Sequence, residues 1–148
     1  MTYFYTFLRQ DRSFKLLLIE ILILLGMARL SVLLFPFKRI ANWMGKSNYE
    51  TTTAMDEGLH AGLVRLSSGI EAVSKYTFWK SNCFAQVLCA HWILKRKNIP
   101  HTIYFGLLKE DTIQMKAHAW LRAGNKIVTG RKGHKDYTVV GKFGFDGC

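Results

Sequence analysis

A nearly continuous run of apolar residues at positions 16–35 is the feature that most limits how this chain can fold. Glu20 and Arg29 interrupt the run, and each such charge at the centre of a membrane-spanning helix costs about 2.5–3.5 kcal/mol. A span needs roughly 18 or more apolar residues, whereas the longest uncharged apolar stretch is 21–28. Asp11 and the lack of a small-residue cleavage site disfavour a signal peptide. We therefore expect a helix that is buried or bound to a partner.

Pro36 should end this helix, because a proline disfavours helical backbone in the residue before it. A short amphipathic helix is expected next, with Ile40, Trp43 and Met44 on one face and Gly45 at its end. Packing of this face onto the domain is the first expectation, and docking of a partner is the alternative. The polar residues 46–58 should form a loop. Residues 1–46 are interpreted as an N-terminal hydrophobic and amphipathic helical segment, and residues 47–148 as the core.

The core begins with helical periodicity and changes to the alternation of strands after Pro100. The first predicted helix lies within 59–77. The second starts at Cys83, is capped by Ser81 or Asn82, and has basic residues at its carboxyl end. Strands are predicted within 101–108, 115–123, 126–130 and 137–143. The pattern predicts an α+β fold in which the helix that carries the cysteine packs on an antiparallel sheet of about four strands.

Charge and cysteine content narrow the expected partners. Twenty-one Lys and Arg against ten Asp and Glu produce a net charge of +11, which favours an acidic partner such as an anionic membrane or polypeptide. The charges are scattered and accompany no recognised nucleic-acid-binding signature, so no nucleic acid is expected. The three cysteines lack paired spacing, which indicates a reducing compartment such as the cytoplasm. No metal or cofactor is expected.

Cys83 and His118 together suggest nucleophilic catalysis. Cys83 is expected in the first turn of a helix, where unpaired backbone N–H groups and the helix dipole stabilise a thiolate, the form that attacks carbonyls. His118, in the sequence AHAW at a strand start, could accept the thiol proton and later protonate a leaving amine. The alternative is that both residues are structural, since a cysteine often packs as a small hydrophobe. Cys89, six residues further along the helix, is interpreted as a core residue.

The order of these features resembles the transglutaminase-like cysteine proteases, in which a helix-start cysteine is followed by a hairpin and by HAW at a strand start. Three segments in order resemble the lasso-peptide leader peptidases more specifically, and the resemblance covers about residues 9–143. These peptidases are the transglutaminase-like half of the lasso maturation protease, encoded apart from the leader-binding half. The three segments are ARLSVLLFPFKRIANWMG, NCFAQVLCAHWILKRKNIPHTIYFG and AHAWLRAGNKIVTG.

The resemblance implies a transglutaminase/papain-like core with Cys83 as nucleophile and His118 as base. The family usually adds an aspartate about a dozen residues after the histidine, where this chain has Thr129 and Gly130. Asp136 is the nearest downstream carboxylate and is the tentative third member; it could instead be a turn residue before a strand. A Cys–His dyad, or a backbone carbonyl that orients the ring, are the other possibilities. Asn82, Ser81 and Gln86 could donate to an oxyanion, and Trp120 could shield the site or fill the core.

The resemblance also implies a function and partners. The chain would be a cytoplasmic cysteine peptidase that removes the leader from a ribosomally made lasso precursor. A separate leader-recognition protein would hold the leader, and a lasso cyclase would act on the freed amine. The apolar first helix and the face formed by Ile40, Trp43 and Met44 are candidate docking surfaces, and peripheral membrane contact is compatible with them. The alternatives are an acyltransferase or transglutaminase on the same fold, and a non-enzymatic, basic, membrane-associated binding protein.

Overall fold

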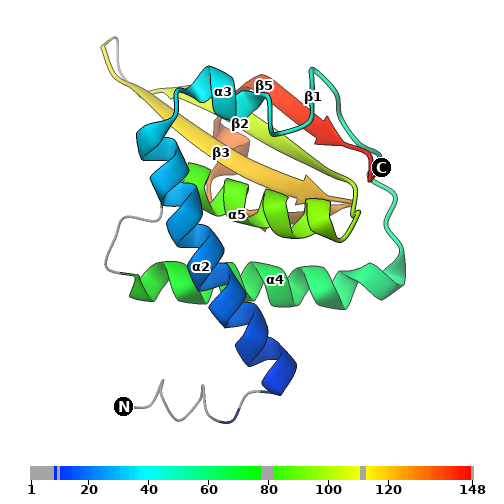
Figure 1. Cartoon of the computed structure of the whole chain (residues 1–148). Helices are drawn as coiled ribbons and strands as arrows, with labels where there is room; N and C mark the ends of the chain where they lie inside the picture. Colours follow the sequence, from blue (N-terminus) through cyan, green and yellow to red (C-terminus); the bar gives the residue numbers. More distant parts are fainter. Residues whose placement is uncertain (1–8, 10, 78–81, 111–112, 148) are drawn as a thin grey trace.

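The computed structural model describes residues 9, 11–77, 82–110 and 113–147. Five strands form one antiparallel sheet in the order β1-β5-β2-β3-β4, and helices cover one of its faces (Figure 1). This arrangement confirms the predicted α+β class. The helices are α2 (Arg12–Leu34), α3 (Phe37–Ala41), α4 (Glu57–Tyr76), α5 (Cys83–Arg96) and the 3-10 helix η1 (His134–Asp136); the strands are β1 (Lys46–Ser47), β2 (His101–Lys109), β3 (Met115–Ala123), β4 (Lys126–Thr129) and β5 (Thr138–Phe145).

The strand β1 was not predicted. Residues 46 and 47 are exposed and polar, so their sequence has no alternation that would mark a strand. They pair with Gly144 and Phe143 at the edge of the sheet. Gly45, immediately before β1, has a φ of 109° and lies so close to the carbonyl of Gly144 that a Cβ would be 2.4 Å from that oxygen. The strand therefore forms because a tight approach to β5 is available, and not because of local propensity.

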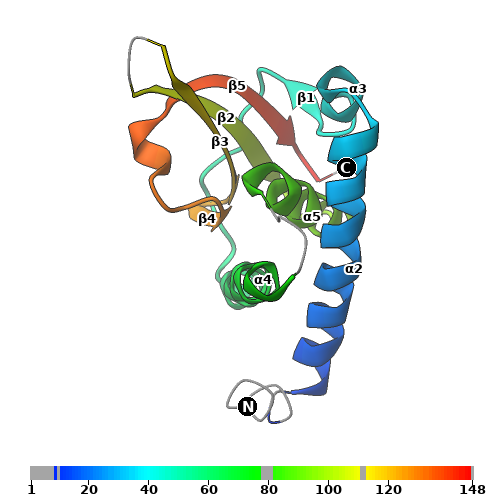
Figure 2. The same ribbon diagram turned by 90° about the vertical axis from the view of Figure 1, so that its left-hand side faces the viewer.

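The helix α2 ends at Leu34, two residues before Pro36, as predicted. Its inward face contains Ile21, Leu25 and Ala28, which are fully buried. These side chains belong to the same buried cluster as the central residues of α5, and α2 packs on both α4 and α5. Figure 2 shows α5 lying between the sheet and α2. The hydrophobic core of this protein therefore includes side chains from both sides of position 46.

The short helix α3 packs onto the domain, which was the first of its two expected roles. Ile40 and the nearby Met44 are buried. Trp43 is half-buried, and its ring meets the ring of Phe35 edge-on with 5.4 Å between centroids. The face formed by Ile40, Trp43 and Met44 is thus largely used inside the protein.

Two buried histidines connect α5 to the sheet and to the segment after α3 through contacts of their ring nitrogens. Nδ1 of His91 lies 2.7 Å from Nε2 of His101, the first residue of β2. Nε2 of His91 lies 2.8 Å from the carbonyl oxygen of Trp43. Burial lowers the pKa of both imidazoles to about 4. Burial favours the neutral form because it removes water from the charged ring.

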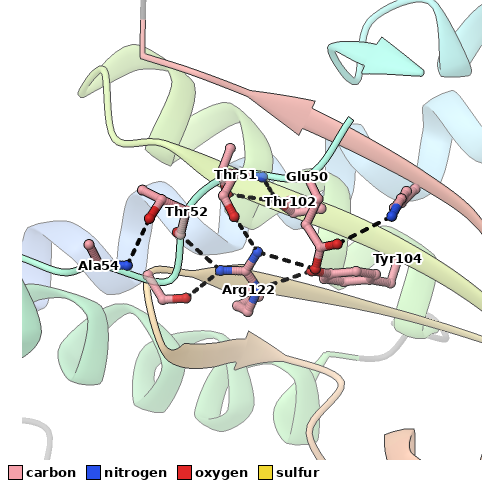
Figure 3. A network of polar contacts seen from close by, with 9 residues as sticks. Glu50, Thr51, Thr52, Ala54, Thr102, Tyr104 and Arg122 are labelled. Atoms are coloured by element: carbon pink, nitrogen blue, oxygen red, sulfur yellow. Dashed lines mark hydrogen bonds and ion pairs between the residues drawn. The ribbon is translucent and has the colours of Figure 1, made fainter. Parts of the chain in front are cut away.

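The face of the sheet that α5 does not cover is crossed by the segment before α4, which a buried arginine holds in place (Figure 3). The Arg122 guanidinium donates hydrogen bonds to the carbonyls of Thr51 and Thr52, at 2.7 and 3.2 Å. It also donates to Tyr104 Oη at 3.0 Å and lies 3.5 Å from the carboxylate of Glu50. The hydrogen bond from Tyr104 is the main reason that the pKa of Glu50 lies below its ordinary value. The segment is thereby fixed to β2 and β3.

Candidate active site

Cys83 is the first residue of α5, as predicted. The side chain of Asn82 caps the helix by accepting a hydrogen bond from the amide of Ala85 at 2.9 Å, so Asn82 fills the capping role for which Ser81 was the other candidate. Ser81 itself lies outside the described residues. Cys83 is half-buried and keeps part of its surface accessible. A partly accessible thiol at a helix amino terminus is where the helix dipole favours a thiolate.

Cys89 provides the opposite case on the same helix. It is fully buried, and its Sγ lies 3.8 Å from the carbonyl oxygen of Ile21. Burial raises the pKa of this thiol to about 12, with a smaller contribution from the charge of Glu20. A thiol with such a pKa is protonated at neutral pH and does not act as a nucleophile. Its interpretation as a core residue is confirmed; Cys148 lies outside the described residues.

His118 lies on β3 opposite Gly106 of β2, and its ring is held on several sides. Nε2 lies 2.8 Å from the carbonyl oxygen of Gly130. A carbonyl oxygen can only accept a hydrogen bond, so Nε2 carries the proton and Nδ1 of the neutral ring keeps its lone pair. The Trp120 ring stacks against the imidazole at 5.8 Å, and the Tyr137 ring lies 5.1 Å from it. The neutral imidazole is therefore fixed in the tautomer that offers Nδ1 as a base.

The residue that supplies this carbonyl has to be a glycine. Gly130 follows β4 and has a φ of 74°, in the left-handed region that side chains rarely adopt. A Cβ there would lie 2.4 Å from the carbonyl oxygen of Ala119 and 2.8 Å from Cβ of Trp120. In the sequence, Gly130 marked a departure from the expected aspartate position. A backbone carbonyl was among the possible orienting groups, but its source could be found only from the fold.

The amino-terminal end of α5 lies over the part of the sheet that carries His118. Phe84, next to Cys83, has its ring 5.5 Å from the ring of Phe105 on β2, and Phe105 pairs with Ala119, next to His118. The other half of α5 lies over the start of β2, where His91 meets His101. Cys83 and His118 therefore belong to the same end of the helix–sheet pair.

The pleat of β3 separates the two side chains. Ala119 and Leu121 belong to the core that β3 shares with α5, whereas His118 and Trp120 occupy the alternate positions of the strand. Within the described part of the chain, no hydrogen bond joins Cys83 to His118, and the ring contacts of His118 are with Trp120 and Tyr137. The candidate nucleophile and base thus lie at the same end of the helix–sheet pair, on different sides of β3 and without a direct bond.

Asp136 lies at the end of η1 and is exposed. The loop that carries it does fold back on the sheet, because the rings of His134 and Tyr137, on either side of Asp136, contact Trp120 and His118. Among the described residues, however, the hydrogen-bond partner of His118 is the Gly130 carbonyl and not the Asp136 carboxylate. The role of Asp136 as a third catalytic group stays a prediction.

The domain as a whole matches a known family. A family model described as the transglutaminase-like superfamily matches residues 22–142, most of the chain. The chain belongs to the transglutaminase-like superfamily. No curated protein and no solved structure matches it. The superfamily includes cysteine peptidases and acyltransferases, and its fold is typically enzymatic. The matched region contains both Cys83 and His118.

This transglutaminase-like domain has a polar cavity of about 570 Å³ between α4, α5 and β4. Gly130, whose carbonyl contacts His118, lines it, and so does Gln86, which lies one helical turn after Cys83. Thr129, whose buried Oγ1 has no hydrogen-bond partner among the described residues, lines it too. The other lining residues, basic and acidic side chains included, are Ser67, Ile70, Glu71, Lys126, Ile127, Val128, Arg131 and Lys132. Within the described residues, no group of three or more His, Cys, Asp or Glu side chains is placed to hold a metal ion.

Proposed function

We propose that the protein is a cysteine peptidase in which Cys83 is the nucleophile and His118 is the base. The observation that carries the proposal is the hydrogen bond from Nε2 of His118 to the Gly130 carbonyl, which leaves Nδ1 as a base at the end of the domain where Cys83 starts α5. Membership of the superfamily supports the same pairing of cysteine and histidine.

In the proposed reaction, Nδ1 of His118 takes the proton of the Cys83 thiol, and the thiolate attacks the carbonyl carbon of a peptide bond. The amides of Cys83 and Phe84, which the cap at Asn82 does not use, would stabilise the resulting oxyanion. The C–N bond then breaks, and His118 gives its proton to the leaving amine. Water attacks the thioester, passes a proton to His118, and releases the acid and the free thiol.

The proposal requires Sγ of Cys83 and Nδ1 of His118 to come within hydrogen-bond distance in the complex with substrate. Hydrogen bonds between catalytic groups are often long or misaligned without substrate and tighten in the reacting complex. A shift of the amino-terminal turn of α5 toward His118 would shorten the distance between the two groups while keeping the bond from Nε2 to Gly130. This requirement makes the dependence of Cys83 reactivity on His118 the decisive test.

We further propose that the substrate is the leader-bearing precursor of a lasso peptide, on the resemblance of three segments of the chain to the lasso leader peptidases. A separate leader-recognition protein would present the precursor, and a lasso cyclase would use the product, both in the cytoplasm. The polar cavity beside Gln86 and Gly130 supports an extended peptide as substrate. Lys126, Arg131 and Lys132 at the cavity favour a peptide with acidic side chains.

The test is alkylation of the purified protein with iodoacetamide from pH 5 to pH 9, followed by mass mapping of the modified peptides. We expect Cys83 to be alkylated at neutral pH, and His118→Ala to lower that reactivity. Cys89→Ala is the matched control and should leave the profile of Cys83 unchanged. An inert Cys83, or a profile that does not respond to His118→Ala, would refute the catalytic pairing.

An acyltransferase is the second candidate, since the superfamily includes such enzymes. The two reactions share the thioester and differ only in what attacks it, water or an amine. Incubation of the protein with a lasso precursor, a leader-recognition protein and a primary amine separates them by mass, because hydrolysis adds water across the cleaved bond and transfer adds the amine.

A further inference from the structure

One face of α2 is apolar from Leu16 to Leu34 and is covered by no described element of the protein. Its eight large side chains are between 43% and 66% exposed. We refer to this set as the outer α2 face; Figure 2 shows that one side of α2 faces α5 and that its other side faces away from the rest of the domain. The eight residues are Leu16, Ile19, Leu22, Ile23, Met27, Leu30, Leu33 and Leu34.

The outer α2 face contains no charged side chain. Between Leu16 and Leu34 the two charged residues of the helix lie beside this face, with Glu20 in an ion pair with Arg96 of α5 and Arg29 half-buried. From Leu16 to Leu34 the stripe extends about 27 Å at 1.5 Å per residue. Among the described residues, α2 is the helix long and apolar enough by composition to cross a membrane, yet its opposite face is packed against the domain. An apolar surface of this extent on a folded protein marks an interaction site.

Basic residues stand at both ends of the outer α2 face. Arg12 and Lys15 lie at its amino end, and Lys38 and Arg39 lie just beyond its carboxyl end. A second copy of the chain is a poor occupant, because antiparallel pairing would set Arg12 and Lys15 against Lys38 and Arg39, and parallel pairing would set like groups together. An apolar surface with negative charge along its borders is the complementary partner. The interface of an anionic lipid bilayer has this chemistry.

The carboxyl end of α2 is followed by Phe37, which connects it to the candidate active site. Phe37, the first residue of α3, is about half exposed, and its ring lies 5.8 Å from the ring of Phe84. Phe84 follows Cys83 directly on α5. A surface that covers α2 and Phe37 therefore reaches the end of α5 where Cys83 lies.

We propose that the outer α2 face docks the protein on an anionic lipid bilayer, with α2 lying in the plane of the membrane interface and the sheet on the water side. The apolar side chains enter the boundary between headgroups and acyl chains, and the basic residues at both ends contact lipid phosphates. Docking of this kind places Cys83 beside the membrane. The proposal does not depend on what reaction Cys83 carries out.

The test is flotation of the purified full chain with vesicles of phosphatidylcholine, with and without about 30% phosphatidylglycerol. We expect at least about tenfold more protein to float with the anionic vesicles, and the floated fraction to fall as ionic strength rises. The Ile23→Lys/Leu30→Lys variant should lose at least about tenfold in binding. This loss would identify apolar insertion, because two added lysines would by themselves strengthen attraction to an anionic surface.

The matched control is Val139→Lys/Val140→Lys, which adds the same charge at two exposed apolar positions of β5 and should keep binding. Thermal unfolding is measured for both variants to check that they are folded. Protein that stays at the bottom of the gradient with anionic vesicles, or equal flotation of the two variants, overturns the proposal. Sedimentation equilibrium is run in parallel, and a dimer dissociated by Ile23→Lys/Leu30→Lys would overturn it in favour of a second copy. Flotation of Cys83→Ala at the wild-type level separates this outcome from any failure of the proposed peptidase.

Discussion

The two faces of the sheet differ in chemistry although they share the same strands. On the face toward α5, β2 and β3 present Ile103, Phe105, Ala119 and Leu121, which pack with the helix. On the other face the alternate residues of the same strands include Tyr104, Trp120 and Arg122, together with His118. The first face buries apolar area, and the second forms hydrogen bonds and ring contacts.

Because successive side chains of a strand point to opposite faces, one strand carries two sets of residues with different roles. Those toward α5 are apolar and buried, and those on the other face make hydrogen bonds and ring contacts. Neighbours in sequence, such as His118 and Ala119, should therefore respond to substitution in different ways. The residues on the α5 face should stabilise the fold through apolar burial, Arg122 on the other face should stabilise it through hydrogen bonds, and His118 should control reactivity.

The largest expected effect is that of His118→Ala on catalysis. A lost general base typically lowers the rate by about 10²–10⁴-fold, and the free energy of unfolding should fall by about 1 kcal/mol for the lost hydrogen bond. The comparison variant is Leu121→Ala on the other face, which should cost about 2–5 kcal/mol of stability. Its rate at low temperature should stay near that of the wild type. Peptide cleavage and urea unfolding measure the two quantities, and a Leu121→Ala variant that is stable but inactive would remove the separation.

Arg122→Met should destabilise the protein by about 2–4 kcal/mol, because it leaves the buried carbonyls of the Thr51 segment and Tyr104 Oη without their donor. The methionine fills similar volume, so the loss reports polar contacts and not a cavity. Arg131→Met is the matched control at an exposed position and should change stability by less than about 0.5 kcal/mol. Equal stability of the two variants in urea would show that the second face contributes no polar stabilisation.

The buried histidines on the α5 side predict an acid-sensitive fold. The pKa values of His91 and His101 are about 4 in the folded protein, against about 6.5 in an unfolded chain. The unfolded chain thus binds more protons between these values, so stability is complete above about pH 6.5 and is lost as pH falls toward 4, by at most about 1.4 kcal/mol per pH unit for each ring. Denaturant unfolding at several pH values measures the slope.

The variant His91→Asn should reduce that slope, since asparagine does not titrate. His60→Gln, at an exposed position of α4, should leave the slope as it is in the wild type. An unchanged slope in His91→Asn would assign the acid sensitivity to other groups.

The smallest expected effect is that of Asp136→Asn, which we expect to change kcat/KM by less than about threefold. The carboxylate is exposed, and the Gly130 carbonyl already accepts the Nε2 proton of His118. Steady-state peptide cleavage tests this directly. A loss of about a hundredfold or more would instead make Asp136 the orienting group, through a rearrangement of η1.

The elements whose ends are determined by residues close together in the chain could be predicted from the sequence. The helix start at Cys83 follows from a capping residue before a periodic run, and the end of α2 follows from Pro36. The burial of Cys89 and the α+β class could be predicted for the same reason. Each of these features leaves a local pattern in the sequence, such as a capping residue, a proline or a periodic run of apolar residues.

Features that depend on contacts between distant residues could not be predicted in this way. The strand β1 forms against Gly144, about a hundred residues away, and Arg122 looked like an ordinary basic residue until the fold brought Glu50 and Tyr104 to it. The partner of His118 was also hidden, because a carbonyl group belongs to every residue and leaves no signature in the sequence. The extent of the outer α2 face became visible only when the packing of its opposite face was known.

The hydrogen bond between His118 and residue 130 limits what mutagenesis can reveal about the groups that assist His118. The acceptor is a main-chain atom, so no codon change removes it while the chain keeps its path. A substitution at position 130 acts by displacing the backbone, since any Cβ would meet the Ala119 carbonyl. An alanine scan would therefore count only two essential polar side chains, even if three groups take part in proton transfer. Semisynthesis that replaces the amide carbonyl of residue 130 with a thioamide, a weaker acceptor, is the kind of change that could expose the third.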